Sequence, residues 1–380
     1  MESVVGKERS EAPGSSGIGA AARSDAHAAW LALSHFPSLD GLRCLSILPV
    51  IWHHSTPRPL AGPLGRGPLG VDLFFAISGF LITTLLLREQ RATGTVSIRK
   101  FYLRRSLRIF PLYYAVLGLY VVRALALMPA SPMRAHFLRS LPWYATYTAN
   151  WFVDFAVPHP VVFAFAWSLA TEEQFYLVWP TVLKLSRRWW APVAFMLLLI
   201  AADQLAERGM LVSVIPWDSV ATRVITSIAT PICLGALLAY ALDRPTSHRW
   251  VRLVLGQWWS APAALAALAA LISLEQLPIT AVHLAMTALV GAVSIRRDHG
   301  LHALTNWAPV RHVGAVSYGA YLLHVSAITA IKGLLPAGMR QAPVVFVLAT
   351  AVTIVAASLA YRYFERPFLQ LRDRFRAQAR

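Results

Sequence analysis

The sequence predicts an all-α membrane protein, a polytopic transmembrane helical bundle of about ten spanning helices plus one interfacial or re-entrant element. Two observations carry this prediction. Of the 380 residues, 57% are hydrophobic and only 14% are charged, and the mean hydropathy of +0.52 is far above that of an ordinary soluble protein. Apolar stretches long enough to cross about 30 Å of hydrocarbon also recur along the whole chain.

The predicted spans follow one another with short connections. The first covers residues 39–54, with the sequence LDGLRCLSILPVIWHH. The others are expected at residues 71–87, 109–128, 161–183, 189–205, 220–242, 254–274, 277–295, 313–331 and 343–360. Residues 137–153 are also apolar, but a span there would put most later basic clusters on the opposite side. Their Trp and Tyr content favours an interfacial or re-entrant element.

The net charge of +17 reports membrane topology. When each predicted span crosses once, most Lys and Arg residues fall in alternate loops, which is the pattern of cytoplasmic loops. This distribution predicts a multi-pass membrane protein with both termini in the cytoplasm. It argues against nucleic acid as the partner of the basic charge, and membrane lipids are the expected surroundings.

Three regions are expected along the chain. Residues 1–34 are rich in Ala, Ser and Gly and predict a disordered cytoplasmic tail. Residues 35–370 form the integral membrane domain, and residues 371–380 form a basic cytoplasmic tail.

Charged and titratable side chains inside membrane helices are functional candidates because they are costly there. Arg43 and His54 lie eleven residues apart, so a helix places them on one face about 16 Å from each other. His54 then lies at mid-membrane depth, just before STPRPLAGPLGRGPLG, which cannot continue the helix. The pattern predicts a histidine delivered into a cavity, where it could act as a general base, with the adjacent His53 used for packing. The alternative is a structural histidine bonded to a neighbouring carbonyl.

Two adjacent carboxylates occupy the middle of another span. Glu172 and Glu173 point about 100° apart on a helix, so they cannot face one cavity equally. At least one is expected to be protonated or paired with an arginine such as Arg43, Arg123 or Arg223. Glu172 is the functional candidate, and the alternative is a buried ion pair that orders the bundle.

A basic cluster precedes the span at residues 109–128. Arg104 and Arg108 share a helix face and Arg105 is adjacent. Guanidinium groups bind phosphate through fixed forks of donors, so the cluster predicts a site for a phosphorylated cofactor. The alternative is that topology alone demands the positive charge of this cytoplasmic loop, with anionic lipid as its partner.

Six motifs in order resemble acyltransferase family 3, a family of polytopic bacterial enzymes that acylate hydroxyl groups of surface polysaccharides and of some small metabolites. The motifs are LDGLRCLSILPVIWHH, GPLGVDLFFAISGFLITTLLL, FYLRRSLRIFPLYY, WSLATEEQFYLVWP, VSYGAYLLHV and YFERPF. His324, in the fifth motif, lacks the proline that the family usually carries two residues later, and the sequence assigns it no role.

The resemblance implies a set of site residues. It makes His54 the catalytic histidine with Arg43 as its partner across the helix. It also implies that Arg104, Arg105 and Arg108 hold an acyl coenzyme A donor, most commonly acetyl-CoA. Ser78, Gly79 and Glu172 are implied to lie near the acyl path, and no metal is expected. The family's bacterial origin implies the bacterial inner (cytoplasmic) membrane as the location.

The predicted function is therefore membrane O-acyl transfer, as in O-acetylation, from acyl-CoA bound on the cytoplasmic side to a carbohydrate or other hydroxyl acceptor. In this hypothesis His54 removes the hydroxyl proton, and Arg43 or nearby donors stabilise negative charge. A transient acyl-histidine is the variant. Alternatives are acylation of a small metabolite of the macrolide type, a transporter or flippase, and an inactive scaffold. A transporter predicts inverted halves, and no matching broken helix is found in the second half.

Overall fold

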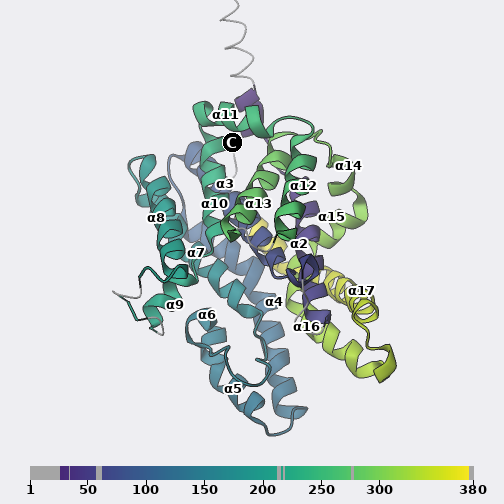
Figure 1. Ribbon diagram of the computed structural model, residues 1–380. Coiled ribbons are helices and arrows are strands. Elements are labelled where there is room, and N and C mark those ends of the chain that lie inside the picture. The colour runs from purple at the N-terminus through teal and green to yellow at the C-terminus, as the bar shows by residue number, and fades with distance from the viewer. Residues whose placement is uncertain are drawn as a thin grey trace, which may run out of the picture.

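The computed structural model describes residues 26–33, 35–56, 62–211, 215–216, 219–274 and 278–375, and within these ranges every regular element is helical (Figure 1). The predicted disordered tail falls largely outside the described residues, as do residues 376–380 of the predicted basic tail. Residues 26–31 of the expected tail are helical. The all-helical prediction is confirmed for the described part of the chain.

The helices in chain order are as follows. The first half contains α2 (Ser38–Ser55), η1 (Pro63–Gly65), α3 (Leu69–Thr93), α4 (Ile98–Ala126), α5 (Pro132–Ala145), α6 (Ala149–Phe152), α7 (Ala166–Leu185) and α8 (Trp190–Glu207). The second half contains α9 (Val220–Thr226), α10 (Thr230–Asp243), α11 (Pro245–Leu255), α12 (Ser260–Ser273), α13 (Ile279–Ile295), α14 (His302–Thr305), α15 (Ala308–Ala315), α16 (Ser317–Leu334), η2 (Ala337–Met339), α17 (Ala342–Ala360), η3 (Tyr361–Glu365) and α18 (Arg366–Asp373).

The expected count of about ten spans is not confirmed. By length and composition, 4 described helices could cross a membrane, or up to 7 if three bent pairs each count as one span. The bent pairs are α9 with α10, α11 with α12 and α15 with α16. Helices α2 and α7 are not among the candidates, although α7 has 20 residues. The reason is physical, because these two helices carry charged and polar residues of the predicted site, which lower their mean hydropathy below that of a candidate span.

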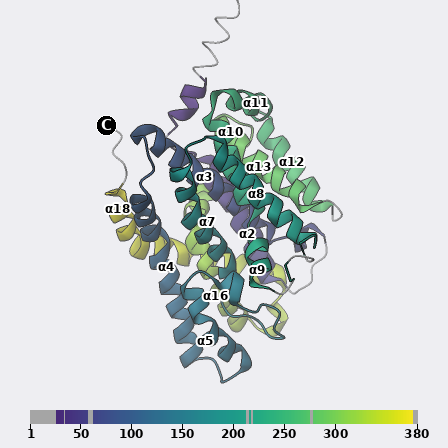
Figure 2. The ribbon, with the colours of Figure 1, turned by 90° about the vertical axis from the view of Figure 1, so that its left-hand side faces the viewer.

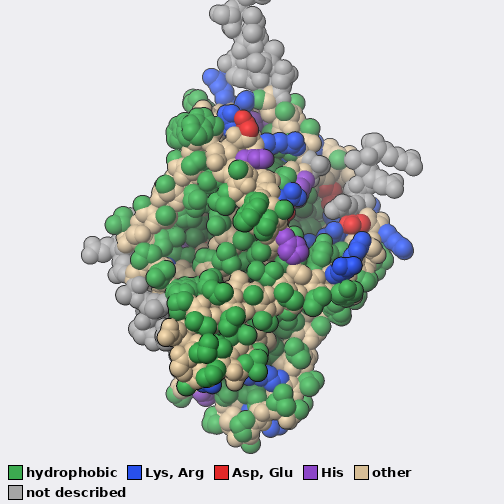
Figure 3. Space-filling model, turned by 90° about the vertical axis from the view of Figure 1, so that its right-hand side faces the viewer, with side chains coloured by type: hydrophobic (Ala, Val, Ile, Leu, Met, Phe, Trp, Pro, Cys, Tyr) green, Lys and Arg blue, Asp and Glu red, His purple; other side chains and the backbone are tan. Residues whose placement is uncertain are grey.

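The segment at residues 137–153 forms the end of α5 and the short α6. Neither helix is among the candidate spans, and the interfacial or re-entrant element stays a prediction. Both views show α11 near one end of the molecule and α5 at the other (Figures 1 and 2). In Figure 3 hydrophobic side chains cover most of the visible face, while Lys and Arg gather toward the end near α11 and along one edge.

Helices α3 and α10 cross at very close range. A methyl group added at Gly79 of α3 would overlap the carbonyl oxygen of Ile232, and one added at Gly235 of α10 would overlap that of Ala76. Only glycine lets two helix backbones approach this closely in a membrane. The indole nitrogen of Trp179 on α7 donates to Thr83 Oγ1 of α3 at 2.8 Å, and both side chains are fully buried. These contacts make α3 the common wall that positions the site.

The start of α2 is fixed by hydrogen bonds to the segment before α15. Ser38 Oγ lies 3.0 Å from His299 Nε2, and Asn306 Nδ2 donates to Ser38 Oγ at 2.9 Å. His299 lies in the loop after α13 and is 2% exposed. Burial, with a smaller contribution from His302, lowers the pKa of His299 to about 4. The anchor therefore uses neutral His299.

Candidate active site

His54 lies in the last turn of α2, and one nitrogen of its ring is hydrogen-bonded to the helix backbone. Its Nδ1 lies 3.0 Å from the backbone oxygen of Val50, one helical turn earlier. A carbonyl oxygen can only accept, so Nδ1 carries the proton and Nε2 carries the lone pair of the neutral ring. The ring of His53 meets it edge-on at 5.2 Å between centroids. His54 is thus bonded to a carbonyl, as the structural alternative required, while it also borders an open space.

That space, which we call the histidine cavity, is lined by both histidines. His53 and His54 border it together with polar side chains from α6 and α9, so His53 does more than pack. Its lining residues are Val50, His53, His54, Pro68, Val71, Asn150, Phe155, Ala164, Phe165, Trp167, Arg223, Thr226, Ser227 and Tyr321. The cavity combines hydrogen-bonding groups with aromatic rings.

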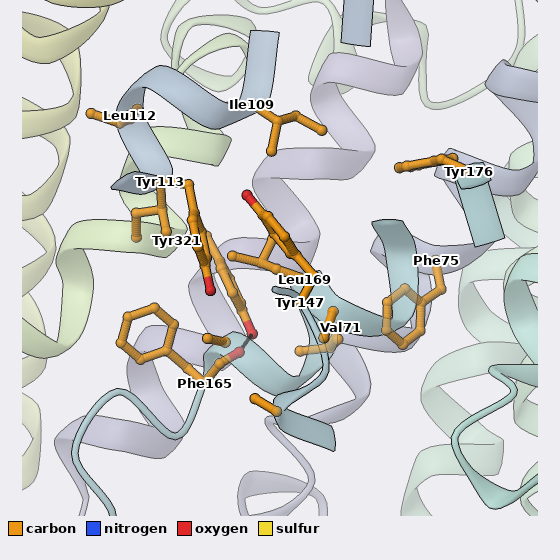
Figure 4. Packing of buried hydrophobic residues seen from close by; sticks show 14 of the residues in the cluster. Val71, Phe75, Ile109, Leu112, Tyr113, Tyr147, Phe165, Leu169, Tyr176 and Tyr321 are labelled. Atoms are coloured by element: carbon orange, nitrogen blue, oxygen red, sulfur yellow. Dashed lines mark hydrogen bonds between the residues drawn. The ribbon is translucent and has the colours of Figure 1, made fainter. Parts of the chain in front are cut away.

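A second space, the central cavity, lies among α2, α3, α4, α7 and α16. It has a volume of about 690 Å³ including its mouths, and its polar lining includes Ser78, Ser168 and Glu172. Glu172 accepts a hydrogen bond of 3.0 Å from the Tyr176 hydroxyl. Tyr321 also borders this cavity and donates to the backbone oxygen of Phe165 at 3.0 Å (Figure 4).

A third space, the basic cavity, contains five arginines and no acidic side chain among its lining residues. These arginines are Arg43, Arg88, Arg105, Arg108 and Arg372. Arg88 donates to the backbone oxygens of Leu33 and Trp30. Such a concentration of guanidinium groups attracts anions, phosphates above all.

The three cavities form a series along α3. The basic and central cavities share Arg43, Ser78, Arg105 and Arg108, and the central and histidine cavities share Val71 and Tyr321. From Val71 to Arg88, α3 rises about 25 Å, close to the thickness of a hydrocarbon core. Ser168 Oγ also lies 2.6 Å from the Tyr321 hydroxyl, which fixes this ring at the boundary.

Glu173, one of the two adjacent carboxylates, pairs with an arginine that the sequence analysis did not propose as its partner. Arg105 Nε lies 3.6 Å from Glu173 Oε1, and its guanidinium lies 3.7 Å from the centre of the Tyr176 ring. Glu173 therefore balances a charge of the basic cluster, while Glu172 borders the central cavity.

The predicted site residues are only partly brought together. Arg43 lines the basic and central cavities and pairs with Asp40 at 2.6 Å, whereas His54 lines the histidine cavity. The two lie on one helix, as expected, but at different ends of the series. Arg105, Arg108, Ser78 and Glu172 line the cavities.

Two predicted residues lie elsewhere. Arg104 donates to Glu89 Oε2 at 2.8 Å and to the backbone oxygen of Phe375 at 3.1 Å, and it lines none of the three cavities. Gly79 faces α10 instead of a cavity. Sequence reasoning missed Arg88 and Arg372 in the basic cavity, and the only signal for them was positive charge next to a predicted span. Among the described residues, no group of three or more possible metal ligands is found.

Comparisons with known proteins agree on one family. Residues 36–362 match the model of a family described as an acyltransferase domain. The chain is 28% identical over 357 residues to the peptidoglycan O-acetyltransferase OatA of Listeria monocytogenes, which covers 88% of this chain and 56% of that protein. It is 28% identical over 359 residues to the putative peptidoglycan O-acetyltransferase YrhL of Bacillus subtilis, covering 88% of this chain and 55% of that protein.

A shorter match is stronger in identity. The chain is 37% identical over 158 residues to a putative O-acetyltransferase of Staphylococcus aureus, and this match covers 40% of this chain and 25% of that protein. The chain spans about half the length of the two relatives that it matches over most of its own length. No solved structure matches it.

Proposed function

This chain belongs to the acyltransferase family matched over residues 36–362, and on that premise we propose that it is a membrane enzyme that transfers an acetyl group from acetyl-coenzyme A to a carbohydrate hydroxyl group. The observation that carries the proposal is the series of cavities with five arginines at one end and His54 at the other. Coenzyme A has matching polarity, because its phosphates and its thioester lie at opposite ends of an extended arm.

The donor is proposed to bind with its phosphates in the basic cavity. Arg43, Arg105 and Arg108 line both this cavity and the central one, so they could grip the phosphates where the arm turns inward. The arm would then pass Ser78 and Glu172 in the central cavity. Arg43 is thereby proposed to act at the donor end rather than beside His54.

The acceptor is proposed to bind in the histidine cavity. Asn150, Arg223 and Ser227 supply hydrogen-bonding groups there, and the Trp167 ring, which is 39% exposed, offers a flat apolar surface. Sugars present hydroxyls at their rims and apolar faces between them, so this lining suits a carbohydrate. The names of the two long relatives refer to peptidoglycan, and a peptidoglycan glycan is the acceptor we propose to test first.

The chemistry follows from the state of His54. Its Nε2 lone pair accepts the proton of the acceptor hydroxyl while the hydroxyl oxygen attacks the thioester carbonyl carbon. The carbon–sulfur bond of the resulting tetrahedral intermediate then breaks, and the coenzyme A sulfur leaves with the proton from His54 Nε2. The products are an O-acetyl ester and free coenzyme A.

The test uses the purified full chain in detergent with labelled acetyl-coenzyme A and soluble peptidoglycan fragments. We expect release of free thiol and label in the glycan, both lost in His54→Gln. His53→Gln removes the neighbouring imidazole of the same cavity and should retain a measurable rate. Wild-type activity in His54→Gln, or equal loss in both variants, would contradict the assignment. Uptake of a glycan into vesicles without thiol release would favour the transporter alternative.

A further inference from the structure

His324 is a second histidine at the site, and nothing in the proposed reaction uses it. It lies on α16, 270 positions after His54, and its side chain is fully buried. The two rings meet edge-on with their centroids 4.8 Å apart. His324 Nε2 lies 3.4 Å from His54 Nδ1, which is a long but direct approach of two ring nitrogens.

The protons on both rings can be assigned from the two carbonyls beside them. His324 Nδ1 lies 2.6 Å from the backbone oxygen of Tyr321, and His54 Nδ1 lies 3.0 Å from that of Val50. Because carbonyl oxygens only accept, each Nδ1 carries a proton. The Nε2 atom of a neutral His324 ring then presents a lone pair to the Nδ1–H of His54, which it shares with the closer Val50 oxygen as a bifurcated hydrogen bond. If both rings carried their protons on Nε2 instead, the lone pair of each Nδ1 would face a carbonyl oxygen, which is unfavourable.

We propose that neutral His324 is a positioning residue that accepts a hydrogen bond from His54 Nδ1–H, fixes the tautomer of His54 and stabilises His54 when it is protonated. This inference rests on the proposed function of His54 as the base. When Nε2 takes the substrate proton, the His54 ring becomes cationic and its Nδ1–H becomes a stronger donor. The bond to His324 therefore strengthens in the step that needs it.

The proton stays on His54 because His324 is a poor place for charge. The His324 ring is packed against Phe165 and Tyr321, with centroid distances of 5.4 Å and 5.5 Å. A cation enclosed by aromatic and aliphatic groups without solvent is unfavourable. A protonated His324 would also turn an N–H toward the N–H of His54. The arrangement thus resembles the orienting partner of a catalytic histidine, with a neutral acceptor in place of a carboxylate.

Other groups around His54 act in both the wild type and the variants. They are His53 on α2, Lys332 on α16, whose Nζ lies 3.5 Å from the His54 backbone oxygen, and Arg223 of α9 across the histidine cavity. On α3, Asp72 follows Val71, but its carboxylate lies 3.3 Å from His283. Changes at His324 leave all of these in place, so a shift in the titration of His54 can be assigned to the lost acceptor.

The test compares His324→Leu, which removes the acceptor, with His324→Gln, whose amide oxygen can replace Nε2. The matched control is Ser326→Ala, which removes only the 3.0 Å bond from α16 to the Tyr120 hydroxyl. Folding of each full-length variant is checked by its elution and melting temperature in detergent. Two titrations of His54 are measured. One is the pH profile of kcat/KM for acetyl transfer, and the other is the pH dependence of carbethoxylation of His54 by diethyl pyrocarbonate, followed by peptide mass spectrometry.

In His324→Leu we expect kcat to fall about 10- to 100-fold, by analogy with the loss of the orienting partner of a metal-binding histidine. The acid limb of both profiles should move to lower pH by about 1 unit, because one such unit corresponds to the strength of one hydrogen bond. His324→Gln should restore the wild-type midpoint, and Ser326→Ala should match the wild type.

Two results would overturn the proposal. They are unchanged profiles in His324→Leu, and an equal shift in His324→Leu and His324→Gln. If His324→Leu does not fold, His324→Ser replaces it in the test, because serine leaves a gap at the acceptor position. A wild-type midpoint and a wild-type kcat in His324→Ser would then also overturn the proposal. The carbethoxylation profile needs no catalysis. If it shifts as expected while His54→Gln still transfers acetyl groups, then the positioning role of His324 stands and the proposed function fails.

Discussion

Arg108 offers the sharpest test of the proposed donor site. It borders both the basic and the central cavity, and in the part of the chain that the structure describes it has no ion pair within 4.0 Å. Its neighbours in the basic cavity include Arg43 and Arg105, each of which already pairs with a carboxylate. Among the arginines that border both cavities, Arg108 should therefore be stabilised most by a bound phosphate.

The expected effect of Arg108→Gln is a change in donor affinity. A hydrogen bond to a charged group contributes about 1.5–3 kcal/mol, and each 1.4 kcal/mol is tenfold in affinity, so KM for acetyl-coenzyme A should rise about 10- to 150-fold. The turnover number at saturation should change little, because the lost contact lies far from the reacting atoms. Glutamine keeps most of the side-chain length, which limits repacking.

The assay measures thiol release with two donors, acetyl-coenzyme A and S-acetylpantetheine, which has the same thioester arm without phosphates. Arg108→Gln should raise KM for the first donor and leave KM for the second unchanged. Arg99→Gln removes the same charge from an exposed position of α4 and serves as the control. An equal rise for both donors, or no rise for either, would refute phosphate binding at Arg108.

Three further predictions concern stability. Thr83→Val leaves the buried Trp179 indole N–H without its acceptor and should cost about 1–3 kcal/mol, seen as a lower melting temperature in detergent; an unchanged value would mean that the indole finds another partner. Gly79→Val forces α3 and α10 apart and should lower the melting temperature more than Gly118→Val, at an exposed position of α4 with open space around it; an equal loss in both variants would mean that α3 and α10 shift apart without cost. Because the folded protein holds the pKa of His299 near 4, below the ordinary value of 6.5, its stabilising contribution is present above pH 6.5 and is lost as the pH falls toward 4. Melting temperatures at pH 7 and pH 5 should therefore differ less in His299→Gln than in the wild type, and an identical difference would exclude this residue as the cause.

The class of the protein and the contents of its site could be predicted from the sequence because they depend on local chemistry. A histidine eleven residues after an arginine lies on the same helix face whatever surrounds it, and Arg105 and Arg108 precede an apolar run that fixes their depth. Of the predicted site residues, all except Arg104 and Gly79 line one of the three cavities, and their roles stay predictions.

Partnerships across helices could not be predicted in the same way. Glu173 pairs with Arg105 from another helix, and no pattern in the sequence favours this arginine over those inside the spans. Arg43 and His54 are separated into different cavities by Tyr321, which comes from α16. Gly79 lies one residue after Ser78 and therefore faces another direction, toward α10. The expected number of spans was not confirmed, because the helices of three predicted spans, α2, α7 and α13, are too polar or too short to count as candidates by length and composition.

The boundary at Val71 and Tyr321 has a consequence for the bilayer itself. An enzyme that accepts a donor from one side and an acceptor from the other needs a route across the membrane, but an uninterrupted water column would let protons and ions run down their gradients. Here the Tyr321 hydroxyl is hydrogen-bonded to Ser168 and to the backbone oxygen of Phe165, so the ring is held in place where the central and histidine cavities meet. On the proposed donor path the thioester arm passes this ring, and the same ring would limit the leakage of ions between the two cavities.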